Sequence, residues 1–163
     1  MLIWLIFLDP SIGKVDKASF SQQTLMELLI KGLDVNAEKI CGSNSPKSIL
    51  EWNGIILDDG TSPDDESCVT EIQWTYMQLE GSLHFEWLPS TVRRVLLYGN
   101  LLKGSIDTSC LNEGLKYCTV AQNRFSSELD LGSLPQAMEV FNASKNEFYG
   151  SIHLDNLPRS LEE

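Results

Sequence analysis

Histidine and cysteine are the side chains in this sequence best suited to catalysis or to metal binding. The chain has two histidines and four cysteines, namely His84, His153, Cys41, Cys68, Cys110 and Cys118. No Cys-x-x-Cys pair or Cys/His cluster has the spacing of zinc ligands. No Ser-His-Asp or Cys-His arrangement that would activate a nucleophile is visible either. The sequence therefore predicts a protein that is not an enzyme and that uses no metal ion or cofactor.

Glycine followed by serine is the other candidate for chemistry, because glycine-rich loops can cradle phosphate groups. Gly-Ser-Leu begins at Gly81, and Gly-Ser-Ile begins at Gly104 and again at Gly150. No such loop ends in Lys-Ser or Lys-Thr, as a phosphate-binding loop would. The spacing instead indicates a repeat, since rows of 23 residues, counted from Gly81 as column 1, align without a gap.

The aligned rows share apolar side chains and one asparagine at fixed columns. Apolar residues recur at columns 3, 8, 12, 15, 17 and 22, and column 20 holds Asn100, Asn123 and Asn146. A strand over columns 14–18 would point columns 15 and 17 into a core and columns 14, 16 and 18 outward, because side chains alternate along a strand. An asparagine amide donates and accepts hydrogen bonds, so it can pair buried backbone groups of a turn. We therefore predict a structural asparagine ladder.

The order of these columns, L-x-x-L-x-L-x-x-N-x-L, is the leucine-rich repeat pattern, whose period is usually about 20–29 residues. One row cannot bury its own apolar face, so we expect an α/β solenoid with a parallel sheet on the concave face. The repeats are expected over 69–163, with a degraded first row, three full rows from Gly81 and a truncated row from Gly150. The uncapped C-terminal coil is expected to favour self-association.

The residues before the repeats are suited to cover the apolar edge of the first coil, so 16–68 are predicted to form an N-terminal cap. Residues 19–33 predict a helix that begins after the N-cap Ser21 and stops at Gly32. Its apolar stripe would be Leu25, Leu28 and Leu29.

The rest of the cap region predicts short elements. Residues 45–52 predict a second helix, with Ser45 as its cap, and residues 55–57 predict a strand after the Asn53-Gly54 turn. The acidic stretch 58–66 lacks the acid spacing of a calcium-binding EF-hand loop, so we expect a solvated loop.

"WNGIIL" at 52–57, followed by Val69-x-x-Ile72-x-Trp74, resembles the N-terminal cap of extracellular plant-type leucine-rich repeat proteins. Such caps read Cys-x-Trp-x-Gly-Val-x-Cys, but Leu50 and Leu57 stand at the two cysteine positions, so the family disulfide cannot form. The resemblance implies that a Cys41–Cys68 disulfide replaces it. The rows with Gly-Ser-Ile-Asp and Leu-Pro resemble repeats of protozoan, kinetoplastid-type secreted or surface proteins.

Charge and the first residues bear on partners and location. The formal net charge of -11 argues against nucleic-acid binding, which needs a basic face. The apolar run in residues 1–13 suits a signal peptide cleaved after Gly13, and the alternative is a buried first strand. No stretch is long enough for a transmembrane span of about 20 residues. We expect a secreted or cell-surface protein.

The outward strand columns predict where a partner would bind. Arginine and tyrosine are enriched at binding hot spots, and two adjacent rows carry Arg93, Arg94, Leu96, Tyr98, Lys116, Tyr117 and Thr119. Asn142 opens a glycosylation sequon, which would matter in a secreted protein. We predict a protein-protein interaction module whose protein ligand binds the concave sheet. The alternatives are a structural surface or coat component without a specific partner and an intracellular scaffold.

Overall fold

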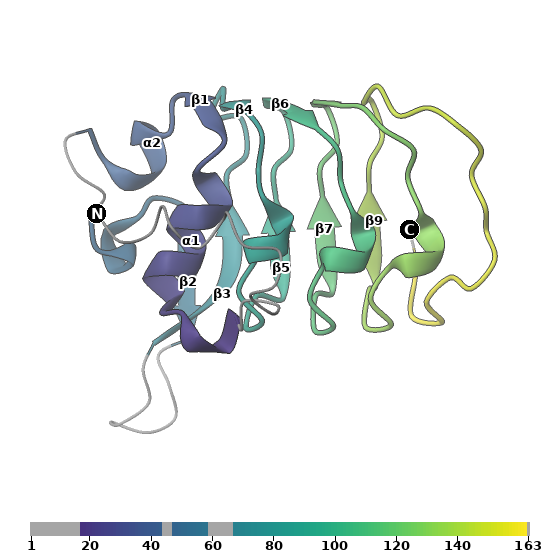
Figure 1. The fold of residues 1–163 in the computed structure, drawn as a ribbon, viewed down its shortest axis with the longest axis horizontal. Helices are drawn as coiled ribbons and strands as arrows, with labels where there is room; N and C mark the ends of the chain where they lie inside the picture. The colour runs from purple at the N-terminus through teal and green to yellow at the C-terminus, as the bar shows by residue number, and fades with distance from the viewer. Residues whose placement is uncertain (1–16, 44–46, 59–66, 163) are drawn as a thin grey trace, which may run out of the picture.

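The structure is a computed structural model that describes residues 17–43, 47–58 and 67–162. Figure 1 shows a row of coils stacked side by side, with α1 and α2 at the N-terminal end. The α-helices are α1 (Gln22–Ile30) and α2 (Glu38–Cys41), and the 3-10 helices are Lys17–Ser19, Ile49–Glu51, Phe85–Trp87, Thr108–Cys110 and Leu131–Ser133. The strands are β1 (Leu33–Val35), β2 (Ile55–Asp58), β3 (Cys68–Gln73), β4 (Glu80–Gly81), β5 (Arg94–Leu96), β6 (Leu101–Gly104), β7 (Tyr117–Thr119), β8 (Arg124–Phe125) and β9 (Val140–Asn142). The predicted signal peptide, residues 1–13, lies outside the described residues.

The larger sheet has the strand order β2-β3-β5-β7-β9 and is parallel from β3 to β9. Val95 lies beside Cys118, and Cys118 lies beside Phe141, so neighbouring strands are offset by the 23 residues of the repeat. This register confirms the predicted period. Strands β5, β7 and β9 cover columns 14–16 rather than 14–18, and the backbone enters the left-handed region at column 19, as at Gln122 (φ 54°) and Lys145 (φ 55°).

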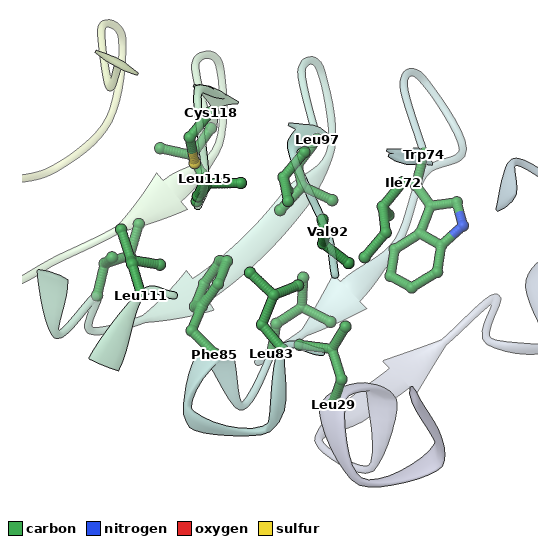
Figure 2. Packing of buried hydrophobic residues seen from close by; sticks show 14 of the residues in the cluster. Leu29, Ile72, Trp74, Leu83, Phe85, Val92, Leu97, Leu111, Leu115 and Cys118 are labelled. Atoms are coloured by element: carbon green, nitrogen blue, oxygen red, sulfur yellow. The ribbon is translucent and has the colours of Figure 1, made fainter. Parts of the chain in front are cut away.

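The core fills the space behind this sheet, as Figure 2 shows. Column 15 and column 17 side chains point inward as predicted, and Leu97 and Val120 are fully buried. They pack with side chains from the rest of each coil, including Phe85 and Leu111. Burial of apolar side chains at about 25 cal/mol per Å² is the main term that holds the coils together.

A second, smaller sheet forms where each coil turns back, with the order β1-β4-β6-β8. The sequence analysis did not predict it, because its strands are as short as two residues and show no alternation. Gly81 lets the backbones approach here: its φ is 118°, and a Cβ would stand 2.3 Å from the carbonyl oxygen of Gly32. The N-terminal strand β1 pairs with β4 antiparallel, so the segment before the repeats extends this sheet.

Helix α1 begins where predicted, because the Ser21 side chain accepts a hydrogen bond from the Thr24 amide. The helix ends at Ile30, and its most buried side chains are Met26 and Leu29, whereas the predicted Leu28 is only half-buried. Gly32 is not a left-handed cap. A Cβ there would stand 2.4 Å from Oγ of Ser82, so glycine allows close contact between this segment and the repeats.

The second predicted helix is reduced to the 3-10 turn Ile49–Glu51, and Ser45 lies outside the described residues. Helix α2 was not predicted from the sequence. The predicted strand after Gly54 is confirmed as β2, which pairs with β3 antiparallel. Most of the acidic stretch 58–66 lies outside the described residues.

The expected Cys41–Cys68 disulfide does not form in the structure. Cys41 is the last residue of α2, and its thiol donates to the carbonyl oxygen of Ala37 at 3.4 Å. Cys68 begins β3, where the register sets it opposite Asp58. Cys41 is thus held in α2 by the backbone hydrogen bonds of that helix, and Cys68 is held in β3 by its pairing with β2.

The C-terminal coil that begins at Gly150 is exposed, as predicted. Columns 3 and 5 are buried in the rows that begin at Gly81 and Gly104 and half-buried in the third row, whereas Ile152 and Leu154 are 69% and 67% exposed. Ile152 lines a groove of about 360 Å³ together with Phe141 and Phe148 of the preceding coil. No further coil within the described residues packs against them. Self-association through this coil stays a prediction.

Candidate protein-binding face

The asparagine ladder runs along the turn that follows each strand. Asn123 accepts a hydrogen bond from the Leu102 amide at 3.0 Å and donates to the carbonyl oxygens of Leu97 and Val120 at 3.0 and 2.9 Å. Asn100 makes the equivalent bonds one coil earlier, and Asn146 makes them one coil later. These amides hold adjacent coils together and are not available to a partner.

The side chains of columns 14 and 16 alternate with buried ones and line the outer side of the larger sheet. We call this surface the sheet face; it comprises Glu71, Gln73, Arg94, Leu96, Tyr117, Thr119, Val140 and Asn142. All but the exposed Gln73 are half-buried. Column 18 departs from the prediction at Ala121, which is buried.

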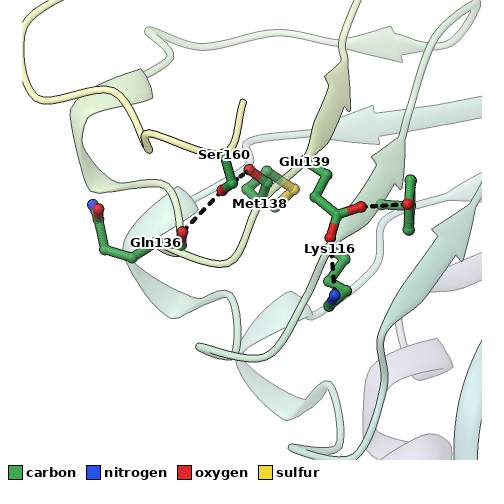
Figure 3. A network of polar contacts seen from close by, with 6 residues as sticks. Lys116, Gln136, Met138, Glu139 and Ser160 are labelled. Carbon is green, nitrogen blue, oxygen red and sulfur yellow. Dashed lines mark hydrogen bonds and ion pairs between the residues drawn. The ribbon is translucent and has the colours of Figure 1, made fainter. Parts of the chain in front are cut away.

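A network of charged and aromatic groups fixes the centre of the sheet face. The guanidinium of Arg94 lies 4.2 Å from the centroid of the Tyr117 ring, and its Nε lies 3.6 Å from a carboxylate oxygen of Glu71. Glu139 accepts hydrogen bonds from the Tyr117 hydroxyl and, at 2.9 Å, from Nζ of Lys116 (Figure 3). Both basic side chains are thus paired with carboxylates.

The network shifts the ionisation of its members. The hydrogen bonds from Tyr117 and Lys116 lower the pKa of the Glu139 carboxyl. The same carboxylate raises the pKa of the Tyr117 hydroxyl and that of the Lys116 ammonium. The Glu139 carboxylate therefore stays charged, and the tyrosine hydroxyl stays neutral, near neutral pH.

Arg93 does not belong to the sheet face, although the sequence analysis placed it there. Its guanidinium donates to the carbonyl oxygens of Ser90 and Val92, at 2.8 and 3.3 Å. It lies against Gly114, where a Cβ would stand 2.4 Å from Nη1. Arg93 thus holds the turn before β5, because column 13 precedes the strand.

Four further residues were predicted on the outward face, and the structure places Leu96, Thr119 and Asn142 on the strands and Tyr98 after β5. Leu96 and Thr119 are neighbours on β5 and β7. Tyr98 follows β5 and packs edge-on against Tyr76, which the sequence analysis missed because its column is not among those that the repeat pattern specifies. Asn142 is half-buried on β9, and its Oδ1 accepts a hydrogen bond from the Ser144 amide; glycosylation stays a prediction.

The structure also bears on the other groups considered for chemistry. Within the described residues no group of three or more His, Cys, Asp or Glu side chains is arranged to hold a metal ion. His84 contacts Glu86 at 3.3 Å. Burial raises the pKa of the Cys118 thiol to about 12, as suits an unreactive core residue. None of the helices in the described ranges is long and apolar enough to cross a membrane.

No protein-family model and no curated protein matches the chain, but solved structures do. The leucine-rich repeat ectodomain of the receptor kinase SOBIR1 from Arabidopsis thaliana aligns at 23% identity with a TM-score of 0.65, covering 87% of this chain and 76% of that one. The BIR2 ectodomain from the same plant aligns at 18% identity with a TM-score of 0.67, covering 84% and 76%.

A third similar structure is the ectodomain of the receptor kinase GASSHO1/SCHENGEN3 from Arabidopsis thaliana, in complex with CASPARIAN STRIP INTEGRITY FACTOR 2. It aligns at 21% identity with a TM-score of 0.63 and covers 78% of this chain and 16% of that one. These likenesses confirm the predicted leucine-rich repeat fold. All three similar structures are plant extracellular ectodomains, so they give no support to the expected protozoan resemblance.

Proposed function

We propose that this chain is a protein-protein interaction module, secreted or at the cell surface, that binds a protein ligand through the sheet face. Arg94, Leu96 and Tyr117 would be its anchors, flanked by Lys116, Thr119 and Tyr98. The single observation that carries the proposal is the stacked and hydrogen-bonded network of Arg94, Tyr117 and Glu139 on an otherwise regular sheet.

The network favours binding because it orders long side chains before a partner arrives. An immobilised side chain costs roughly 0.5–1.5 kcal/mol on association, and a side chain that is already ordered avoids most of that cost. Arginine and tyrosine are also the residue types that most often act as hot spots. Leu96 adds an apolar contact next to them.

The solved structures support the same direction. The similar ectodomain of GASSHO1/SCHENGEN3 is in complex with CASPARIAN STRIP INTEGRITY FACTOR 2 in its structure. Leucine-rich repeat ectodomains are typically not enzymes, in agreement with a sheet face whose polar groups bind one another. Fold-level likeness is an analogy, so the proposal rests mainly on the sheet face itself.

The test is a pair of matched double variants. Arg94→Ala with Tyr117→Ala removes the proposed anchors. Arg124→Ala with Tyr149→Ala removes the same residue types from β8 and from the last coil, and both of those side chains are exposed. Each variant would be checked for its melting temperature and then titrated against a partner purified with the native protein.

Loss of two hot spots at about 2 kcal/mol each should weaken binding by roughly a thousandfold, and the control should bind as the wild type does. Equal binding by both double variants would contradict the proposal. It would favour a coat component, or another surface, over the sheet face.

A further inference from the structure

Two tyrosines form a corner at the end of the sheet face. The rings of Tyr76 and Tyr98 have their centroids 5.1 Å apart and stand at 83° to each other. Tyr76 is 66% exposed although it is a large aromatic side chain. The Tyr76 ring is therefore open to solvent, and the half-buried Tyr98 ring, two residues after Leu96 of β5, stands nearly perpendicular to it.

The backbone holds this corner in place. The Tyr76 amide donates to the carbonyl oxygen of Tyr98 at 3.0 Å, which ties the two coils together. Tyr76 has a φ of 53°, a left-handed conformation that is uncommon for a bulky residue. Its ring lies over Gly99, where a Cβ would stand only 2.5 Å from the ring. Gly99 thus makes room for the ring at the same column where Tyr76 itself stands one row earlier.

The chemistry of such a corner suits a cation. Aromatic faces carry negative charge density, and a Lys or Arg group within about 6 Å of a ring centroid is attracted to it. With their centroids 5.1 Å apart, the two rings can both lie within that distance of one cation. The hydrogen bond with Tyr98 raises the pKa of the Tyr76 hydroxyl, so the ring stays neutral at physiological pH. The sheet face already contains one contact of this kind, between Arg94 and Tyr117.

The charges of the chain favour a cation that a binding partner supplies. Within the part of the chain that the structure describes, no cation of the protein itself stands over either ring of the corner. The nearby Lys39 donates to the carbonyl oxygen of Met77 and to Oε1 of Gln78, at 2.9 and 3.3 Å. The whole chain carries a net charge of -11, which draws basic partners at long range.

We propose that the corner between Tyr76 and Tyr98 binds a lysine or arginine side chain from a basic segment of the protein partner. The inference rests on the proposed function and specifies the kind of partner. The sheet face would bind the rest of the segment, with the aromatic corner selecting its basic residue.

A random peptide library displayed on phage and selected on the immobilised protein provides the test. Enriched peptides should contain Lys or Arg. One enriched peptide, made synthetically, should bind Tyr76→Asn or Tyr98→Leu about two- to fivefold more weakly, as expected for an exposed cation–π contact. Tyr76→Phe keeps the ring and should bind as the wild type does. Asn tolerates the left-handed backbone, so Tyr76→Asn should fold.

Tyr149→Asn is the matched control, because Tyr149 is also 66% exposed but lies in the last coil. It should leave binding unchanged. Peptides that lack basic residues, or that ignore Tyr76→Asn and Tyr98→Leu while losing affinity on Arg94→Ala, would overturn this inference and leave the proposed function standing. Peptides that respond to none of these substitutions would overturn both.

Discussion

Replacing Asn123 by Ala should destabilise the protein by about 2–4 kcal/mol, far more than an ordinary surface substitution. Asn123 is only 7% exposed, and Leu102, whose amide it accepts from, is fully buried. Without the asparagine, water cannot reach that amide. A buried donor left without a partner costs roughly 1–3 kcal/mol.

The carbonyl groups lose less than the amide does. Leu97 O still accepts from Asn100 at 2.9 Å, and Val120 O still accepts from Asn146 at 3.0 Å. Each lost second bond contributes about half of a typical net hydrogen bond, whose value is about 1 kcal/mol. One orphaned amide and two weakened carbonyls therefore give the total of about 2–4 kcal/mol.

Asn146→Ala is the matched comparison. Asn146 makes the same bonds, but its side chain is half-buried, so water can replace it. We expect a loss near 1 kcal/mol. Urea unfolding, followed by the fluorescence of the buried Trp74, measures both free energies of unfolding. Equal losses for the two variants, or a loss below about 1 kcal/mol for Asn123→Ala, would refute the reasoning.

Three further predictions concern the core and the turns. Leu97→Ala removes a fully buried side chain and should cost about 2–5 kcal/mol in urea unfolding, while the folded protein should keep its partner affinity; a silent substitution would mean that the strand register is shifted by one residue. Gly81→Ala should destabilise the protein more than Gly104→Ala does. Both glycines have positive φ, but a Cβ at Gly81 would stand 2.3 Å from the carbonyl oxygen of Gly32, whereas one at Gly104 would stand 3.5 Å from Ser82. Equal melting temperatures for the two variants would contradict the role of this close approach. The pKa of the Cys118 thiol is raised to about 12 in the folded protein, so the thiol loses its proton at a lower pH in the unfolded chain than in the folded one. The free energy of unfolding should therefore fall from about pH 9 towards pH 12. This part of the fall should disappear in Cys118→Ala when unfolding is measured across that pH range.

The sequence predicted the fold well because the same spacing of apolar and asparagine residues recurs in each row. The length of a row predicted the offset between Val95 and Cys118. The recurrence of asparagine at one column predicted the structural roles of Asn100 and Asn123. The second sheet was not readable, because its short strands are set by backbone approach at Gly81 rather than by side-chain alternation. Ile152 is 69% exposed, as expected for the C-terminal coil, because a side chain at its column is buried only where another coil covers it.

The candidate site was predictable by column but not by contact. Arg94 and Tyr117 stand on the expected columns, yet nothing in the spacing showed that they stack or that Glu139 accepts from Tyr117. Arg93 has the right residue type but bonds the turn before its strand. Tyr76 stands at column 19, which holds Gly99 in the next row and is not among the columns that the repeat pattern specifies, so the spacing did not indicate it.

Hydrogen–deuterium exchange of the protein with and without its purified partner tests the central claim most directly. Binding to the sheet face should slow amide exchange in β5 and β7, and the exchange of β6 and β8 on the other sheet should stay unchanged. Peptide-level mass spectrometry separates these segments along the chain. Protection confined to β6 and β8, with β5 and β7 exchanging as in the free protein, would contradict the claim that this chain binds its partner through the sheet face.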